Sequence, residues 1–183
     1  AGLITLCGSL PSGVDAATLL PWFAALTAQR KRLIVDSSGA ALEAAVQARV
    51  YGIKVNAAEL GALLGRRITT SAEALTAVAQ LRARGIALAV VTLGAQGAVA
   101  ADASGTWQAR PPAIQAVSSV GSGDSLLAGL ATGFLRGNAL PEALRLGVAC
   151  GAADAETLGG GLFRAERVAQ LVQTTEMDES AAP

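Results

Sequence analysis

The chain has 183 residues, of which 52% are hydrophobic and 15% charged, so it is long enough and apolar enough to bury the core of a single domain. Fourteen basic and fourteen acidic side chains give a formal net charge of zero, which argues against nucleic acid as a partner because phosphate binding needs a basic surface. The sequence has no histidine, which excludes Ser-His-Asp triads, Cys-His pairs and imidazole catalysis. Any chemistry must use carboxylates, Lys, Arg, hydroxyls and backbone amides.

The two cysteines, Cys7 and Cys150, are too few for a disulfide framework and lie among apolar or small residues, which predicts buried, reduced thiols. No apolar run approaches the roughly 18 residues of a membrane span, and no charged signal-peptide segment opens the chain. We therefore expect a cytoplasmic protein without a membrane partner. Because the chain enters a strand-like run directly after Ala1, we also expect it to be a fragment of a longer protein.

Short apolar runs alternate with longer stretches of helical period in the first half of the chain, which is typical of βαβ units and a mainly parallel sheet. The expected strands are residues 3–7, 33–36, 53–55 and 86–92. The expected helices are residues 16–30 behind Asp15 as N-cap, 40–50, 57–64, and a helix between a Thr70–Glu73 capping box and Gly85. The pattern predicts an α/β fold with helices on both faces of the sheet.

The second half begins with a predicted hairpin of residues 98–101 and 106–109, because residues 102–105 are rich in turn formers. Three helices follow, at 121–136, from Pro141 to about residue 158, and at 165–172. The acidic, apolar-poor segment 174–183 is predicted to be a disordered tail. We assign residues 1–173 to a single α/β core.

The most informative segment is Val117 to Ser125, where small residues and one carboxylate precede a predicted helix. Small side chains let backbone N–H groups converge, and the helix N-terminus adds its positive dipole end, so the segment suits a phosphoryl group. Asp124 in the first helical turn could accept a proton from an attacking hydroxyl. Taken alone, the segment also fits an ordinary glycine turn in which Asp124 is the N-cap of the helix. That structural interpretation is the commoner one for such a segment.

Two further segments lie where an ATP-dependent kinase needs them. Lys54 to Glu59 ends a strand and starts a helix, which places an amide and a carboxylate one turn apart and suits a hydrated Mg²⁺; a plain capping box of Asn56 and Glu59 explains the spacing equally well. Thr92 to Gly97 follows a buried strand, at the carboxyl end where open α/β sheets bind ligands. A Rossmann fingerprint is excluded by Leu126, and a P-loop by the missing Lys.

Together these segments resemble those of the ribokinase-like PfkB carbohydrate kinases, and within them the phosphosugar branch that contains 1-phosphofructokinase, the minor 6-phosphofructokinase and tagatose-6-phosphate kinase. The matching stretches occur in the family's order and the resemblance extends to about residue 172. They are Gly8 to Gly13, Val35 to Gly39, Lys54 to Glu59, Thr92 to Gly97 and Ser118 to Ser125. Val55 stands where the family usually has Pro, and Ser122 where it more often has Ala.

The resemblance implies that Asp124 is the general base on the acceptor hydroxyl, and that the amides of Gly121, Ser122 and Gly123 form an anion hole. It also implies that Ser9 lies near the phosphate of the sugar. By the same resemblance, the following residues bind the nucleotide: Lys54 and Asn56 at its phosphates, and Thr92, Gly94 and Gly97 along its length.

The resemblance implies two cation sites as well. Asn56 and Glu59 would organise Mg²⁺ through water, and the carbonyls of Ser118 and Val120 would hold a monovalent cation, K⁺, together with the loop of Gly159 to Gly161.

The implied activity is transfer of the γ-phosphoryl group of ATP, with Mg²⁺, to a hydroxyl of a ketohexose phosphate. The implied acceptors are fructose 1-phosphate, fructose 6-phosphate or tagatose 6-phosphate. The resemblance also implies that a lid sheet and an N-terminal part of the kinase are absent from this chain, which alone would be incomplete, and that the full-length protein is a homodimer. The alternative is a nucleotide-binding module, or a degenerate relative, without catalysis.

Overall fold

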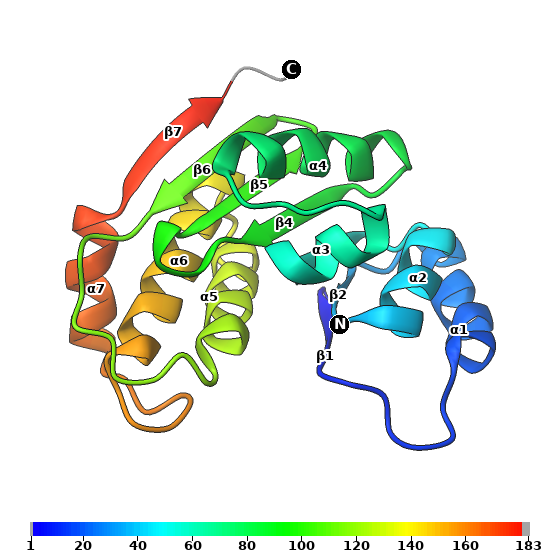
Figure 1. The fold of residues 1–183 in the computed structure, drawn as a ribbon, viewed down its shortest axis with the longest axis horizontal. Helices are drawn as coiled ribbons and strands as arrows, with labels where there is room; N and C mark the ends of the chain where they lie inside the picture. The colour runs from blue at the N-terminus through cyan, green and yellow to red at the C-terminus, as the bar shows by residue number, and fades with distance from the viewer. Residues whose placement is uncertain (1, 181–183) are drawn as a thin grey trace. The chain divides into compact units, whose positions relative to one another are not determined.

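The structure is a computed structural model that describes residues 2–180. These residues form two compact units (Figure 1). The first unit contains residues 2–92 and 99–106, and the second contains residues 93–98 and 107–180. None of the helices in residues 2–180 combines the length and hydropathy that crossing a bilayer requires.

The first unit is built on four parallel strands, as the sequence predicts, and these strands lie side by side in chain order. The strands are β1 (Ile4–Cys7), β2 (Leu33–Asp36), β3 (Gly52–Asn56) and β4 (Leu88–Thr92). The helices between them are α1 (Ala16–Ala28), α2 (Gly39–Gln47), α3 (Ala57–Leu64) and α4 (Ser71–Ala83). Strand β5 (Ala98–Asp102) follows β4 in the sheet, and the hairpin turn to β6 (Gly105–Arg110) lies where it was predicted.

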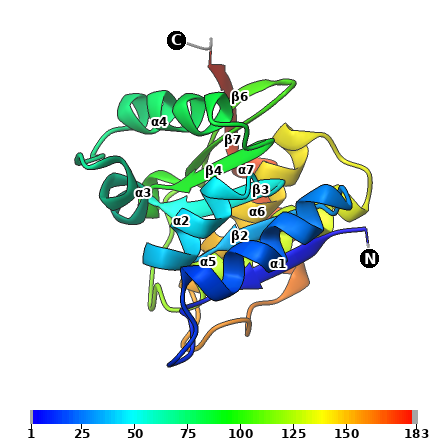
Figure 2. The same ribbon diagram turned by 90° about the vertical axis from the view of Figure 1, so that its right-hand side faces the viewer.

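The core of the first unit lies around β3 and β4. Every residue from Gly52 to Val55 and from Leu88 to Val91 is buried. Successive side chains of a strand point to opposite faces, so both faces of these strands are covered, which is typical of parallel sheets in α/β proteins. Phe23 of α1 and Leu42 of α2 are fully buried as well, and these two helices lie side by side (Figure 2).

Polar side chains cap the starts of α1, α3 and α4 in this unit. Asp15 accepts the N–H of Thr18 at the start of α1, and Thr70 and Glu73 form the predicted capping box of α4. Capping of this kind satisfies the N–H groups that the first helical turn leaves without a partner. Each of these caps is visible in the sequence because the residue types and their spacing are fixed by the geometry of the turn.

The second unit contains the remainder of β6, strand β7 (Glu176–Ser180) beside it, and three helices. The helices are α5 (Ser122–Leu135), α6 (Leu140–Ala155) and α7 (Ala165–Thr174), and a short 3-10 helix, η1 (Gly94–Gln96), lies in the loop 93–98. α5 and α6 lie side by side and run antiparallel, with Gly151 beside Ser122 and Gly133 beside Ala143 (Figure 1).

Two expectations from the sequence are wrong. The segment from Thr174 was predicted to be disordered, but Thr174 ends α7 and Glu176–Ser180 form β7; the rest of that prediction, residues 181–183, lies outside the described residues. The acidic strand is stabilised by ion pairs of Arg110 in β6 with Glu176 and Asp178. Cys7 was predicted to be buried, but it is exposed, because β1 lies at the edge of the sheet and alternates between half-buried and exposed residues.

Glu73 gives the stability of the first unit a pH dependence. Hydrogen bonds from the backbone N–H of Thr69, the hydroxyl of Thr69 and the N–H of Thr70 lower the pKa of the Glu73 carboxyl below its ordinary value of 4.5. A lowered pKa in the folded state means that the ionised carboxylate stabilises the fold above about pH 4.5, and that this contribution disappears as the pH falls through the lowered pKa.

We therefore expect Glu73→Gln to be less stable than the parent protein at pH 7, with a difference that shrinks as the pH is lowered below 4.5. Urea unfolding of both proteins between pH 7 and pH 3 measures this difference. A difference that stays constant over that range would contradict the assignment of the stabilising contact to the ionised form of Glu73.

Candidate active site

The carboxyl ends of four parallel strands bring one group of predicted site residues to one edge of the first unit. Cys7 is in register with Asp36, and Asn56 is in register with Thr92, so the loops after β1 and β2 and the ends of β3 and β4 share that edge. Ser9 is exposed in the loop after β1. That loop is held to the end of β2, because Gly8 donates its N–H to the carbonyl of Asp36 at 3.0 Å.

Lys54 lies in β3 and is only 5% exposed. Its Nζ is 2.6 Å from Oδ2 of Asp36 at the end of β2. The predicted phosphate-binding ammonium is therefore ion-paired within the unit, with a partner to which the sequence analysis gave no role. Ser37, which follows Asp36, is also buried and donates its hydroxyl to the carbonyl of Gly8 at 2.7 Å, which further ties the two loops together.

Asn56 and Glu59 form a complete capping box at the start of α3. Oδ1 of Asn56 accepts the N–H of Glu59 at 2.9 Å, and Oε2 of Glu59 accepts the N–H of Asn56 at 2.8 Å. The structural alternative for this segment is thus confirmed. It does not exclude the second role, because the other carboxylate oxygen of Glu59 accepts no hydrogen bond from the residues described, and a hydrated Mg²⁺ binds proteins through such oxygens.

In the second unit, Gly94 and Gly97 shape the loop that follows β4. Both have positive φ, +59° and +85°. The N–H of Gly97 donates to the carbonyl of Gly94 at 3.0 Å, and a Cβ on Gly97 would lie 2.0 Å from the carbonyl oxygen of Ala109. Gly97 is therefore required by both its backbone conformation and its packing. Gly94 is exposed and has open space around it, so packing does not require a glycine there.

The glycine turn before α5 leaves several backbone donors available. Gly121 is the N-cap of α5, with φ +91°, and its carbonyl accepts the N–H of Ser125 at 2.8 Å. The N–H of Ser122 donates to the carbonyl of Ser119 at 3.3 Å, whereas those of Gly121, Gly123 and Asp124 have no acceptor among residues 2–180. Such a set of unsatisfied N–H groups at a helix N-terminus favours an anion.

Asp124 is the third residue of α5 and is exposed. It is not the N-cap, and its carboxylate makes no hydrogen bond or ion pair to the part of the chain that the structure describes. The N-cap role that the sequence left open for Asp124 is therefore wrong, because Gly121 is the N-cap of α5. An exposed carboxylate without a partner is able to receive a proton from a bound molecule.

Asp154, a residue that the sequence analysis overlooked, is buried beside the glycine turn. It lies near the end of α6 and is 1% exposed. Its Oδ1 accepts the N–H of Gly161 at 2.5 Å, and its Oδ2 lies 3.5 Å from Oγ of Ser122. The signal in the sequence was its position as an isolated charge in an alanine- and glycine-rich helix.

The predicted cation ligands Ser118 and Val120 precede the same turn. The N–H groups of Val117 and Ser118 both donate to the carbonyl of Ala155, at 2.7 and 3.1 Å, which fixes this segment against the end of α6. The carbonyls of Ser118 and Val120 themselves accept no hydrogen bond from residues 2–180. They therefore remain able to coordinate a cation.

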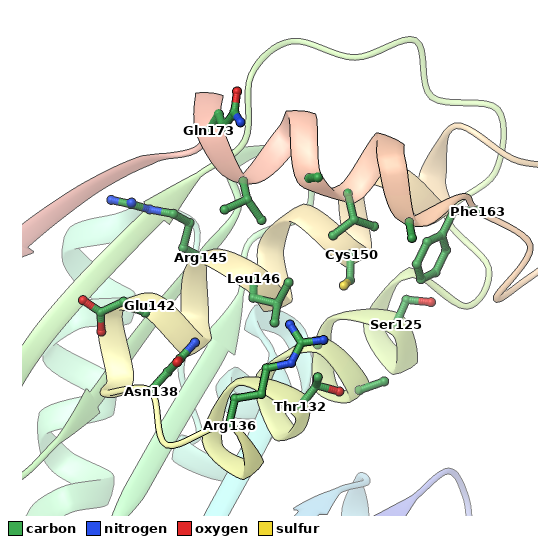
Figure 3. A pocket seen from close by; sticks show the side chains of 16 residues that line it. Ser125, Thr132, Arg136, Asn138, Glu142, Arg145, Leu146, Cys150, Phe163 and Gln173 are labelled. Carbon is green, nitrogen blue, oxygen red and sulfur yellow. The ribbon is translucent and has the colours of Figure 1, made fainter.

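A groove of about 730 Å³ lies among α5, α6 and α7, and most of its lining is apolar. Figure 3 shows Cys150 and Phe163 in its wall, with Arg136, Arg145 and Glu142 toward its other end. Burial raises the pKa of the Cys150 thiol. Ser125 lines the groove but Asp124 does not, so the groove is separate from the turn that presents Asp124.

Comparison with known proteins identifies the family of this chain. Residues 1–165 match the model of the pfkB family carbohydrate kinases. The chain belongs to this family. The fold is ribokinase-like, as the sequence predicts.

Two curated members of the family are similar over most of this chain. It is 35% identical to 1-phosphofructokinase of Escherichia coli over 175 residues, which cover 96% of this chain and 56% of that enzyme. It is 37% identical to ATP-dependent 6-phosphofructokinase isozyme 2 of Escherichia coli over 153 residues, covering 82% and 50% of the two chains. The chain thus spans about half the length of these pfkB kinases.

A solved structure of a pfkB kinase shows the same fold. Phosphofructokinase-2 from Escherichia coli in complex with potassium superposes with a TM-score of 0.87 and 32% sequence identity, covering 93% of this chain and 56% of that one. The family resemblance read from the sequence is therefore confirmed.

The ion pair of Lys54 and Asp36 yields a prediction about stability. Both side chains are largely buried, 6% and 12% exposed, so replacing Lys54 removes the ammonium that lies 2.6 Å from a largely buried carboxylate. We expect Lys54→Met to lower the free energy of unfolding by about 3 to 5 kcal/mol, and Lys54→Met with Asp36→Asn to recover part of that loss. Urea unfolding of both variants measures this; a double variant that is less stable than the single one would contradict a buried, mutually compensating pair.

The contact between Gly121 and the loop 159–161 yields a second prediction. A Cβ on Gly121 would lie 2.7 Å from Cα of Gly160 and 3.0 Å from Oδ2 of Asp154, and the positive φ adds strain. We expect Gly121→Ala to cost at least about 2 kcal/mol of unfolding free energy. Gly137→Ala is the matched control, because Gly137 has φ +84° and open space around it, and should cost only about 1 kcal/mol. Equal losses would show that packing at Gly121 is not constrained.

Proposed function

We propose that the protein containing this chain is an ATP-dependent phosphosugar kinase that transfers the γ-phosphoryl group to a hydroxyl of a ketohexose phosphate. The observation that carries the proposal is the exposed, unpartnered carboxylate of Asp124 in the first turn of α5, beside N–H groups of Gly121 and Gly123 that have no acceptor among the described residues. A base and an anion-binding turn are the two groups that phosphoryl transfer to an alcohol requires.

In this mechanism Asp124 removes the proton of the acceptor hydroxyl as its oxygen attacks the γ-phosphorus. The bond between that phosphorus and the bridging oxygen of ADP breaks, so the products are the phosphorylated sugar and ADP. The amides of Gly121 and Gly123, with that of Ser122 once its long bond to Ser119 opens, hold the negative charge on the phosphoryl oxygens. The chain has no histidine to form a phosphoenzyme, so direct in-line transfer is the simplest route.

The groups proposed for the nucleotide lie in the first unit and in the loop 93–98, which belongs to the second. Lys54 and Asn56 would contact its phosphates, and Thr92, with Gly94 and Gly97 of the following loop, would line its length. Because Lys54 is paired with Asp36, its ammonium is held in a fixed position at the end of β3 and would be shared between Asp36 and a phosphate. Mg²⁺, when bound, would neutralise phosphate charge, and Glu59 with Asn56 would orient its water ligands.

We propose the remaining roles from the resemblance to the family. Ser9 would contact the phosphate of the sugar, and the carbonyls of Ser118 and Val120 would coordinate K⁺. The potassium complex of Escherichia coli phosphofructokinase-2 supports the second assignment. We also propose that the full-length protein is a homodimer.

The central test is Asp124→Asn in the full-length protein. Loss of the base should lower kcat by about 10² to 10⁴-fold, while the affinity for ATP changes little because the amide neither adds nor removes a contact to the nucleotide. Glu166→Gln is the matched control, since Glu166 is also an exposed acid in the first turn of a helix of the same unit and should leave kcat unchanged. Near-normal turnover of the Asp124 variant would refute the assignment of the base.

The acceptor is tested by ADP release in the presence of fructose 1-phosphate, fructose 6-phosphate and tagatose 6-phosphate, with the unphosphorylated sugars as controls. The names of the two curated relatives support a phosphorylated fructose as acceptor. Comparable rates on unphosphorylated sugars would remove the phosphosugar assignment. Binding of ATP without turnover on any of them would instead favour a nucleotide-binding module.

A further inference from the structure

Asp154 is an unusual residue for its position. It is 1% exposed and lies in the last turn of α6, where a negative charge is opposed by the negative end of the helix dipole. No Lys or Arg within residues 2–180 pairs with it. A buried carboxylate without a basic partner is costly, so the hydrogen bonds that it makes must compensate.

These hydrogen bonds connect two loops. Oδ1 of Asp154 accepts the N–H of Gly161 at 2.5 Å, and Oδ2 lies 3.5 Å from Oγ of Ser122, the first residue of α5. The hydroxyl of Thr157 donates to the carbonyls of both Asp154 and Gly159, at 2.9 and 3.2 Å. The carboxylate therefore bridges the glycine loop 159–161 and the start of α5.

The bridge lies at a tightly packed point. The Cα of Gly160 is so close to Gly121 that a Cβ on Gly121 would come within 2.7 Å of it, and within 3.0 Å of Oδ2 of Asp154. The adjoining carbonyl of Ala155 accepts the N–H groups of Val117 and Ser118. The end of α6 thus holds both the segment that enters the glycine turn and the residue that begins the helix after it.

We propose that Asp154 is a positioning residue for the anion hole: its two carboxylate oxygens hold the loop 159–161 and Ser122 together, so that the N–H groups of Gly121 and Gly123 keep one orientation. This inference rests on the proposed kinase function for its effect on turnover. The effect acts through the turn, because Asp154 is buried and contacts the backbone of the loop and the side chain of Ser122.

We expect the hydrogen bonds of Asp154, and not its negative charge, to keep the N–H groups of the turn in place. A negative charge near the turn lowers the positive potential that attracts a phosphoryl group, so the charge of Asp154 opposes anion binding. Asparagine keeps both contacts, because its carbonyl oxygen can accept from Gly161 and its amide can donate to the hydroxyl of Ser122. Alanine removes both contacts.

The experiment compares Asp154→Asn and Asp154→Ala in the full-length protein. We expect Asp154→Asn to keep kcat within about threefold of the parent, with a KM for ATP that is unchanged or lower. We expect Asp154→Ala to lower kcat by about 10 to 100-fold while KM for ATP changes by less than about threefold, because misplacement of the donors weakens the transition state more than the ground state. All rates are expressed per folded protein.

Glu156→Gln is the matched control. Glu156 lies two residues further along, at the same end of α6, and pairs with Arg167 at 2.6 Å, but it makes no described contact with the glycine turn. Its replacement should lower the thermal unfolding temperature and leave kcat unchanged. If Asp154→Ala is too unstable to purify, Asp154→Ser replaces it, since its hydroxyl is too short to bridge the two loops.

Either of two kinetic results would overturn the inference. Equal losses of kcat in the Asn and Ala variants would show that the charge is what matters, and an unchanged kcat in the Ala variant would show that Asp154 serves stability alone.

Amide hydrogen exchange separates this inference from the proposed function, because it does not depend on activity. The N–H of Gly161 bonds to Asp154, and the N–H of Ser125 bonds to the carbonyl of Gly121 and reports on the turn. Exchange at both amides should accelerate in Asp154→Ala and not in Asp154→Asn, with Val91 of β4 as the unaffected reference. If the parent protein shows no kinase activity, the proposed function fails while the exchange data still decide the positioning role; unchanged exchange at Ser125 would overturn it.

Discussion

The close packing of α5 against α6 is the constraint on which the geometry of the second unit depends. Four glycines make it possible, since a Cβ at any of them would lie within 3.0 Å of an atom of the facing helix. They are Gly129 and Gly133 in α5 and Gly147 and Gly151 in α6. A Cβ on Gly151 would lie 2.9 Å from the carbonyl oxygen of Ser122, so the contact extends to the first residue of α5. The glycine turn at Gly121 is therefore positioned by backbone packing, which tolerates little displacement.

The first unit positions its groups in a different way. Parallel register places the ends of β1 to β4 at one edge, and the polar groups there are largely paired with one another. Lys54 bonds Asp36, Ser37 bonds Gly8, and Asn56 and Glu59 cap α3 reciprocally. Groups that are held by such contacts lose little conformational freedom when a ligand binds, so the same bonds that stabilise the unit also prepare it for a polar ligand.

The sequence predicted the elements well where local chemistry determines them. The capping boxes at Asn56 and Thr70, and the glycine turn at Gly121, depend on residue types within one helical turn, and all three lie where they were expected. The errors concern long-range contacts: Arg110 stabilises β7 from 68 residues away, and the exposure of Cys7 follows from the edge position of β1. The ion pair of Lys54 with Asp36 and the contacts of Asp154 were missed for the same reason, since the spacing of residues along the chain does not predict such long-range contacts.

The two carboxylates near the glycine turn show how the environment separates residues of one chemical type. Asp124 is exposed and has no partner among the described residues, so its carboxylate is available for contacts with a bound molecule. Asp154 is buried and holds Gly161 through a short hydrogen bond, so any change in its contacts would displace the loop and the turn. A group that must exchange a proton during each turnover needs the first environment, and a group that must keep donors aligned needs the second. The division of roles that we propose for Asp124 and Asp154 therefore follows from burial, although both residues are aspartates within reach of one helix N-terminus.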